Sequence, residues 1–379
     1  MNKKIVTLLK MIVLSLGLIA VVSVAGKNKG HKVDSGEEAG ATSHYFAMGT
    51  SISVSVYSED KSVDENSLKE KIVEDIKRLD QQVLSWRSTT SELGEVNNNT
   101  VGSTQISEEL YVVLKQSLQI CKDSEGALDI TIRPLAALWN IEGDNKGEFV
   151  PPAKEEIAET LKLVDYEAIT LLSEQYSTSS ALDEAKPQAN ENTNYYVTCA
   201  SEGIIIDLGA TGKGYALDQS KANLIEAGVE GALVTVGGSV LVYGEKTDGS
   251  SWKIGVRDPL KPNDTSAMMG YLEFEPGTVT CVSTSGGYEK FKTYEGKDYH
   301  HILDSKTGYP SDSGLLSVTV VCDNGLVSDG LSTACFVLGY EKSLPLLEKY
   351  NAQAVFLDTN GNIIVTEDLK DNWIKNNSR

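Results

Sequence analysis

A glycine-rich turn at residues 207–214, which reads Asp-Leu-Gly-Ala-Thr-Gly-Lys-Gly, is the densest cluster of residues suited to binding a ligand. We expect it to join a strand over 203–208 to a helix over 214–227. Backbone amides at a helix start favour an anion, and Lys213 would add a positive charge. The turn fits neither the P-loop pattern nor the GxGxxG fingerprint. A phosphate site and a purely structural connection are therefore both open.

A second cluster pairs Asp329 with Thr333, four residues apart in an expected helix over 328–338. This spacing places both side chains on one helix face. The rest of the helix is apolar, which indicates burial, and a buried carboxylate needs a partner. Carboxylate and hydroxyl oxygens suit Mg²⁺. The alternative is that Asp329 only complements the start of its own helix.

The adjacent pair His300 and His301 supplies the only histidines expected inside the folded body, because His31 and His44 precede it or lie at its entry. We assign His300 a structural role and take His301 as the candidate for proton transfer near neutral pH. The chain contains no HExxH and no GxSxG motif. Neither a zinc site nor a serine hydrolase is therefore supported.

The elements that must position these residues are predicted from hydrophobic periodicity. Alternating apolar residues predict strands at 52–57, 232–236, 252–256, 278–283, 315–322 and 354–357. Further helices are expected at 67–83, 110–123 and 342–350. Residues 85–95 form an expected polar loop containing Trp86, and the polar stretch 174–194 is expected as a surface insertion or hairpin tip. This order predicts an α+β fold in a single body of mixed sheets with packed helices.

The N-terminus has the pattern of an export signal. Three lysines precede an uncharged run at 11–25, which is shorter than the roughly 20 residues that span a bilayer. A cleaved signal peptide and a retained membrane anchor over 1–25 are both open. The first cysteine is Cys121, so a lipid anchor on an N-terminal cysteine is excluded. We expect a flexible tether over 26–42, a folded domain over 43–370 and an extracytoplasmic location.

The composition of the chain limits the kinds of ligand and partner that it can bind. The chain has 379 residues, is 40% hydrophobic and carries a formal net charge of −20. An acidic surface repels phosphate backbones, so nucleic acid is a poor partner. Any phosphate-bearing ligand must be held locally by a metal or a helix start. Five scattered cysteines without a CxxC motif support neither a disulfide framework nor a structural zinc site.

Taken in order, a set of short motifs resembles the ApbE family. They are Met48-Gly49-Thr50, Ala127-Leu128-Asp129-Ile130-Thr131, Pro134-Leu135, Leu138-Trp139, the turn at 207–214, Gly237-Gly238, Thr284-Ser285-Gly286, His301-Ile302-Leu303-Asp304 with Thr307-Gly308, and residues 329–333. The resemblance implies a fold that binds FAD in a cleft and uses Mg²⁺. It also implies transfer of FMN from FAD to a Thr or Ser hydroxyl of another protein, with release of AMP.

The resemblance implies a role for each matching residue. The flavin and its nucleotide would be contacted by Met48, Trp86, Ala127, Leu128, Asp129, Asp207, Lys213 and Leu303. Mg²⁺ would be ligated by the Ala210 carbonyl, Asp329 and Thr333, and His301 would be the base. The chain departs from the family where relatives often have Tyr at the position of Trp86, and some have Asp at the position of Ser332. Ser239 stands where an acid or amide is frequent.

Two alternative functions would use the same cleft. Water in place of the acceptor hydroxyl would give Mg²⁺-dependent hydrolysis of FAD to FMN and AMP. A non-catalytic flavin-binding protein would bind FAD without turnover. For the transferase, the expected partners are FAD, an exported or membrane flavoprotein of a redox chain as acceptor, and the membrane through the N-terminus.

Overall fold

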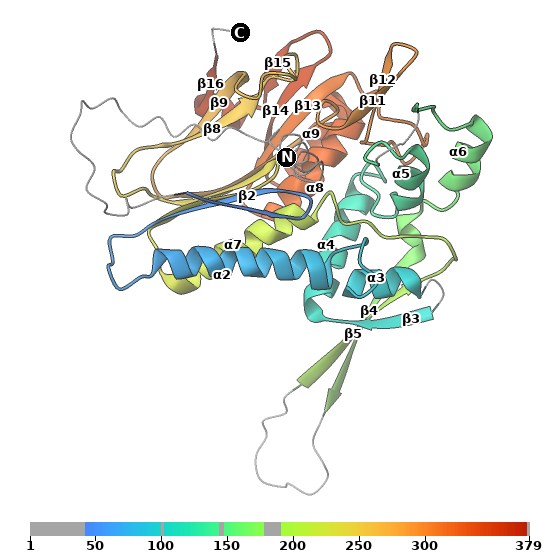
Figure 1. Ribbon diagram of the computed structural model, residues 1–379, viewed down its shortest axis with the longest axis horizontal. Helices are drawn as coiled ribbons and strands as arrows, with labels where there is room; N and C mark the ends of the chain where they lie inside the picture. The colour runs from blue at the N-terminus through green and yellow to red at the C-terminus, as the bar shows by residue number, and fades with distance from the viewer. Residues whose placement is uncertain (1–41, 100–101, 144–147, 178–190, 377–379) are drawn as a thin grey trace, which may run out of the picture.

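The structure is a computed structural model that describes residues 42–99, 102–143, 148–177 and 191–376 (Figure 1). The expected signal segment 1–25 and nearly all of the expected tether lie outside the described residues. Among the described helices, none is long and apolar enough to cross a membrane. The fold mixes helices and sheets, as the sequence predicts.

An eight-stranded antiparallel sheet forms the centre of the body. Its strands, in spatial order, are β1 (Ser43–Ala47), β2 (Thr50–Tyr57), β6 (Gly231–Val236), β7 (Ser239–Gly244), β10 (Thr278–Gly286), β13 (Leu315–Cys322), β14 (Gln353–Asp358) and β15 (Ile363–Val365). Gly237 and Gly238 make the two-residue turn between β6 and β7, where Val236 pairs with Ser239. Gly237 has φ +60°, which a glycine adopts without strain.

Alternation of apolar residues gives this sheet two buried faces. Val234 and Leu241 pack into a core shared with helices, whereas their neighbours Leu233 and Val242 pack into a second core. A smaller sheet of β8 (Trp252–Arg257), β9 (Met268–Phe274) and β16 (Trp373–Lys375) covers that second face. Because β16 pairs with β9, the fold continues past residue 370, where we expect the domain to end.

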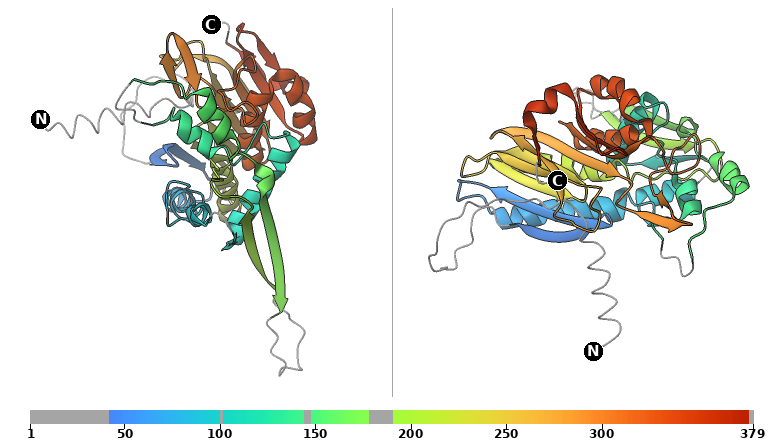
Figure 2. Two further views of the ribbon diagram at one scale, coloured as in Figure 1. Left: turned by 90° about the vertical axis from the view of Figure 1, so that its right-hand side faces the viewer. Right: turned by 90° about the horizontal axis from the view of Figure 1, so that it is seen from above.

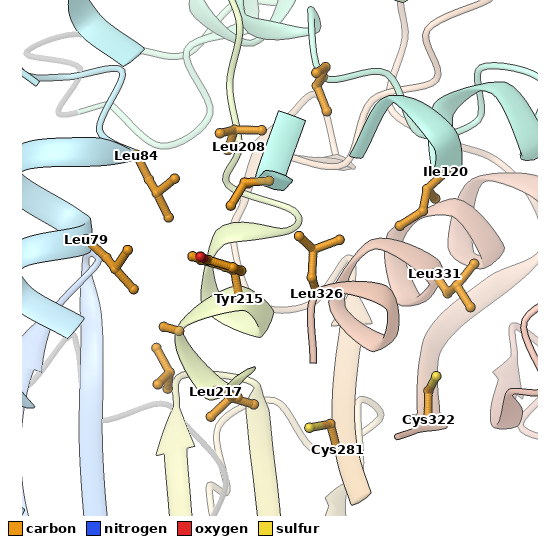
Figure 3. Close-up of a cluster of buried hydrophobic side chains, with 14 of the residues drawn as sticks. Leu79, Leu84, Ile120, Leu208, Tyr215, Leu217, Cys281, Cys322, Leu326 and Leu331 are labelled. Atoms are coloured by element: carbon orange, nitrogen blue, oxygen red, sulfur yellow. The ribbon is translucent and has the colours of Figure 1, made fainter. Parts of the chain in front are cut away.

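Helices cover the first face of the central sheet (Figures 1 and 2). They are α2 (Glu65–Arg78) with the π-helical turn η1 (Leu79–Val83), α4 (Glu108–Asp123), α7 (Gly212–Ala227), α8 (Gly325–Leu338) and α9 (Tyr340–Lys349). Figure 3 shows the buried side chains that fill the space around α7 and α8, among them Tyr215, Leu217 and Leu326. All five cysteines are buried and free.

A smaller region completes the body beside the ends of α4 and α8. It contains α3 (Glu92–Asn98), α5 (Arg133–Trp139), α6 (Lys154–Leu161), the short helix η2 (Tyr166–Ala168), and the hairpin β11 (Phe291–Tyr294) and β12 (Lys297–His300). The strands β3 (Gly102–Ile106), β5 (Glu191–Cys199) and β4 (Ile169–Ser177) form a three-stranded sheet. The β4–β5 hairpin projects from the body, and it contains the described part of the expected insertion (Figures 1 and 2). A further short helix, η3 (Glu367–Asn372), precedes β16.

The expected strand over 203–208 is wrong. This segment makes one isolated bridge, between Ile132 and Ile205, and no ladder. The reason is that the side-chain amide of Asn97 takes both backbone groups of Ile206, accepting from its N–H at 2.8 Å and donating to its carbonyl at 2.9 Å. The expected polar loop 85–95 is also wrong at its end, because Ser91 caps the N-terminus of α3 through the amide of Gly94.

Candidate active site

A cleft of about 510 Å³ lies where the central sheet, α7, α8 and the α5 region meet. The structure brings all of the residues implied by the family resemblance to this one cleft. They are Met48, Trp86, Ala127, Leu128, Asp129, Asp207, Ala210, Lys213, His301, Leu303, Asp329 and Thr333. These residues come from segments almost 300 positions apart, so their convergence is a property of the fold.

The turn between β1 and β2 places Met48 at the cleft. Met48 has φ +52°, a left-handed conformation that a non-glycine residue rarely adopts. Its backbone N–H donates to Oδ2 of Asp80 at 2.7 Å. Asp80 belongs to the π-helical turn η1, a kind of irregularity that is frequent at functional sites. The strained turn is therefore held by a carboxylate that the sequence motif does not reveal.

Trp86 lies between two arginines. The guanidinium carbon of Arg133 is 3.5 Å from the centre of the indole ring, and that of Arg87 is 4.1 Å from it. Arg87 also approaches Glu142 at 3.5 Å, and Glu142 pairs with Lys290 at 2.8 Å. An aromatic surface with cations on it thus forms one wall of the cleft.

Asp129 is buried and its carboxylate is engaged within the protein. Oδ1 accepts from the backbone N–H and the hydroxyl of Thr131, at 2.8 and 2.6 Å, and Oδ2 accepts from the N–H of Tyr166 at 3.2 Å. Burial raises the pKa of Asp129, and these hydrogen bonds oppose that shift. The carboxylate therefore shapes the segment that carries Ala127 and Leu128 along the cleft.

The glycine-rich turn does not offer a row of unused amides. The N–H groups of Thr211 and Gly212 both donate to the Leu208 carbonyl, that of Gly209 donates to Oδ1 of Asp207, and that of Gly214 donates to Oδ2 of Asp329. The positive charge that this turn presents to the cleft is therefore that of Lys213. Its Nζ donates to the Gly209 carbonyl at 2.7 Å and lies 3.4 Å from Oδ2 of Asp329.

Asp329 is only 3% exposed. Besides the Gly214 amide at 3.0 Å, it accepts from the Ser239 hydroxyl at 3.2 Å. Burial raises its pKa, and the Lys213 ammonium opposes the shift. Because Asn324 caps α8 and Asp329 bonds to the third residue of α7, the alternative that Asp329 complements the start of its own helix is wrong.

The donor set around Asp329 fits a hard divalent cation. Thr333 follows one turn later on α8, with its hydroxyl 3.0 Å from that of Ser285, and Ala210 lines the same part of the cleft. A carboxylate, a hydroxyl and a carbonyl are oxygen donors of the kind that Mg²⁺ takes together with waters. The described residues contain no cluster of three or more His, Cys, Asp or Glu side chains that could hold a metal.

His301 is half-buried in the cleft wall. Its Nδ1 lies 3.2 Å from the Lys290 carbonyl, which can only accept, so Nδ1 carries the proton and Nε2 keeps a lone pair. Burial, together with the nearby Lys290 ammonium, lowers the pKa of His301 to about 4. The ring is therefore neutral at pH 7 and able to accept a proton. His300 instead bonds through Nε2 to the Ser311 carbonyl at 3.0 Å and does not line the cleft.

Sequence motifs miss several charged residues of the cleft. These are Asp80, Arg87, Arg133, Glu142, Glu289 and Lys290. One signal was available, because Arg133 is a lone charge in the otherwise apolar stretch 130–139. The remaining five lie in polar stretches, where a cleft residue and an ordinary surface residue look the same.

Comparisons with known proteins agree with this geometry. A family model described as the ApbE family matches residues 48–356, and the chain therefore belongs to the ApbE family. It is 31% identical over 327 residues to the FAD:protein FMN transferase of Haemophilus influenzae, covering 84% of this chain and 87% of that protein. It is 29% identical over 323 residues to the protein of the same name from Treponema pallidum, covering 82% and 83%.

Solved structures show the same fold. The ApbE protein of Thermotoga maritima superposes with a TM-score of 0.73 at 30% identity, covering 88% of this chain and 98% of that one. The apo form of the Pseudomonas stutzeri flavinyl transferase ApbE gives a TM-score of 0.69 at 26% identity, covering 88% and 96%.

Proposed function

We propose that this enzyme is an FAD:protein FMN transferase, which moves FMN from FAD to a Thr or Ser hydroxyl of another protein and releases AMP. The observation that carries the proposal is the convergence on one cleft of the twelve residues to which the family resemblance gives a role. It is supported by relatives named FAD:protein FMN transferase over more than four fifths of the chain.

The cleft offers a surface for each part of FAD. Met48 and Trp86 provide an apolar thioether and an aromatic face for the flavin ring, with Ala127 and Leu128 beside them. Asp207 and Lys213, which also line the cleft, would meet the nucleotide. The Lys213 ammonium provides a fixed positive charge for the phosphates. The main chain at Leu303, bridged to Pro310, closes the cleft near His301.

The neutral Nε2 of His301 is the base for the acceptor hydroxyl. As the hydroxyl oxygen bonds to the FMN-side phosphorus, its proton passes to Nε2, and the bond from that phosphorus to the AMP oxygen breaks. The hydrogen bond from Nδ1 to the Lys290 carbonyl holds the ring in the required tautomer. Lys213 offsets part of the negative charge that develops on the phosphates.

The site also suits one Mg²⁺, with Asp329, Thr333 and the Ala210 carbonyl as ligands. When bound, the ion would neutralise negative charge on the pyrophosphate. The chain's own part is to hold Asp329 in place through Gly214, Ser239 and Lys213. A divalent cation bound to Asp329 would compete with Lys213 for that carboxylate and would leave the ammonium available to a phosphate.

We further propose that the enzyme works outside the cytoplasm. The support is the lysine-led apolar segment at 1–25, which fits an export signal or membrane anchor. An exported or membrane flavoprotein of a redox chain is then the acceptor.

The test combines two assays. Purified protein is incubated with FAD and Mg²⁺, with and without candidate acceptors from the extracytoplasmic fraction. Flavin attached to protein and free AMP are both measured. If the enzyme is a transferase, free AMP and flavinylated protein should form together. Rapid AMP release without acceptor supports FAD hydrolysis instead, and FAD binding without either product supports a non-catalytic flavin protein.

A further inference from the structure

The guanidinium of Arg133, unlike that of Arg87, has no hydrogen-bond partner among the described residues. It stacks on Trp86 and lies within electrostatic range of Asp207, Arg87 and Glu142. Arg87, in contrast, approaches a carboxylate of Glu142. Burial lowers the pKa of Arg133, which reflects the cost of desolvating a cation without an acceptor.

Helix stability does not explain this placement. Arg133 is the first residue of α5, where the positive end of the helix dipole disfavours a cation. A partly buried charge at an unfavourable helix position is typical of a ligand site.

The two distances to Trp86 define how the arginines are arranged. A guanidinium carbon 3.5 Å from a ring centre is in face contact, so the planar group lies flat on the indole. Arg87, at 4.1 Å, must lie on the opposite face, because two guanidinium groups this close to one ring centre would overlap on the same face. Both faces of Trp86 are therefore covered by cations.

We propose that Arg133 recognises the polar edge of the flavin ring. This inference rests on the proposed function, in which the flavin stacks beside Trp86. For the ring to reach that surface, one guanidinium must slide aside, and Arg133 is the one without a hydrogen bond to lose. Because it lies flat on the indole, its N–H groups lie in the layer that the flavin enters. They then point at the in-plane carbonyl oxygens and ring nitrogen of the dioxopyrimidine edge, which are acceptors.

The experiment measures binding alone, in the absence of acceptor protein. Dissociation constants for riboflavin, FMN, FAD and ADP are determined by flavin fluorescence or calorimetry for the wild type, Arg133→Ala and Arg133→Lys. Riboflavin carries the ring without phosphate, and ADP carries phosphates without the ring. Lys162→Ala is the control, since Lys162 is the exposed residue that directly follows α6 and lies outside the cleft. Thermal unfolding shows that each variant is folded.

We expect Arg133→Ala to weaken the binding of riboflavin, FMN and FAD alike, by about tenfold or more, because a charged hydrogen-bond donor is lost. ADP binding should not change. Arg133→Lys should also bind riboflavin weakly, because riboflavin is neutral and lysine lacks the planar fork.

Three results would overturn the assignment. The first is that Arg133→Ala binds the flavins as tightly as the wild type or more tightly. The second is that Arg133→Ala weakens the binding of FMN and FAD but not of riboflavin. The third is that Arg133→Lys binds riboflavin with full affinity. A wild type that binds no flavin would instead contradict the proposed function.

Discussion

Replacing Gly214 with alanine should disrupt the crossing of α7 and α8. A Cβ at Gly214 would lie 2.0 Å from the carbonyl oxygen of Gly325 and 2.7 Å from Cβ of Asp329. Ordinary contact starts near 3.4 Å, so one helix must move by about 1.4 Å. Neither obstacle is the flexible end of a side chain. We expect a loss of about 3 kcal/mol in the free energy of unfolding, or roughly 6 °C in Tm.

The same displacement should damage the site beyond its effect on stability. The Gly214 amide holds Oδ2 of Asp329 at 3.0 Å, and Lys213 approaches the same oxygen at 3.4 Å. A helix shift of this size breaks the first contact and misplaces the second. Misplacement of catalytic groups by about 1 Å can cost on the order of 10²-fold in rate. We therefore expect FMN transfer to fall by about that factor even at a temperature where the variant is fully folded.

Gly212→Ala is the matched control, two residues earlier in α7. Its Cβ would meet Cδ1 of Leu84 at 3.6 Å, an ordinary contact. Alanine favours the helix by up to about 1 kcal/mol over glycine, so Tm should stay level or rise. The measurements are calorimetric unfolding and a flavin-transfer assay. The packing argument is refuted if Gly214→Ala unfolds at the wild-type temperature, or if Gly212→Ala is equally destabilised.

Further predictions concern three residues of the site, His301, Asp329 and Trp86. His301→Gln should keep FAD affinity and slow transfer by about 10²- to 10⁴-fold. In the wild type, protonation of His301 should not reduce kcat/KM as the pH falls through 6.5, because the lowered pKa keeps this base neutral. It should reduce kcat/KM near pH 4. Asp329→Asn should remain folded and lose both Mg²⁺-dependent thermal stabilisation and transfer. Trp86→Ala should weaken FAD binding by about tenfold, whereas Trp86→Tyr should largely retain it.

For each of these three residues, one result would contradict the prediction. A wild-type rate that falls with an apparent pKa near 6.5 would mean that the environment of His301 does not shift its titration. A Mg²⁺ titration that stabilises Asp329→Asn as much as the wild type would remove Asp329 from the metal site. Equal FAD affinity in Trp86→Ala would place the flavin elsewhere in the cleft.

Five of the eight strands of the central sheet, β2, β6, β10, β13 and β14, were predicted because they are short runs rich in apolar and β-branched residues, whereas β1, β7 and β15 were not. Leu315–Cys322 forms the strand that the pattern predicts, with the same bounds. The segment 203–208 has the same apolar character and is not a strand, because Asn97, more than 100 residues earlier, takes the backbone groups of Ile206. A side chain that replaces a strand partner leaves no periodic trace in the sequence.

Twelve residues of the cleft were predictable from the family resemblance, but six of its charged residues and the reasons for most identities were not. The turn at 207–214 predicts a cradle of amides for phosphate, yet the structure uses most of those amides internally. Gly214 is required at the helix crossing, where Gly325 faces it. Ser239, whose role the family comparison leaves open, donates to Asp329. Such pairings depend on tertiary contacts and have no local signature.

The charge of the cleft argues for a cation between this protein and FAD. Among its described lining residues, six are acidic and four are basic, which gives a formal charge of −2 with His301 neutral. The Lys213 ammonium is already paired with Asp329, so it cannot by itself offset a pyrophosphate. A divalent ion at Asp329 would cancel this formal charge of −2. Mg²⁺ should therefore tighten binding of FAD, and leave riboflavin, which has no phosphate, almost unaffected. If Mg²⁺ strengthens the binding of both ligands equally, or of neither, the ion does not act on the pyrophosphate and the electrostatic reasoning fails.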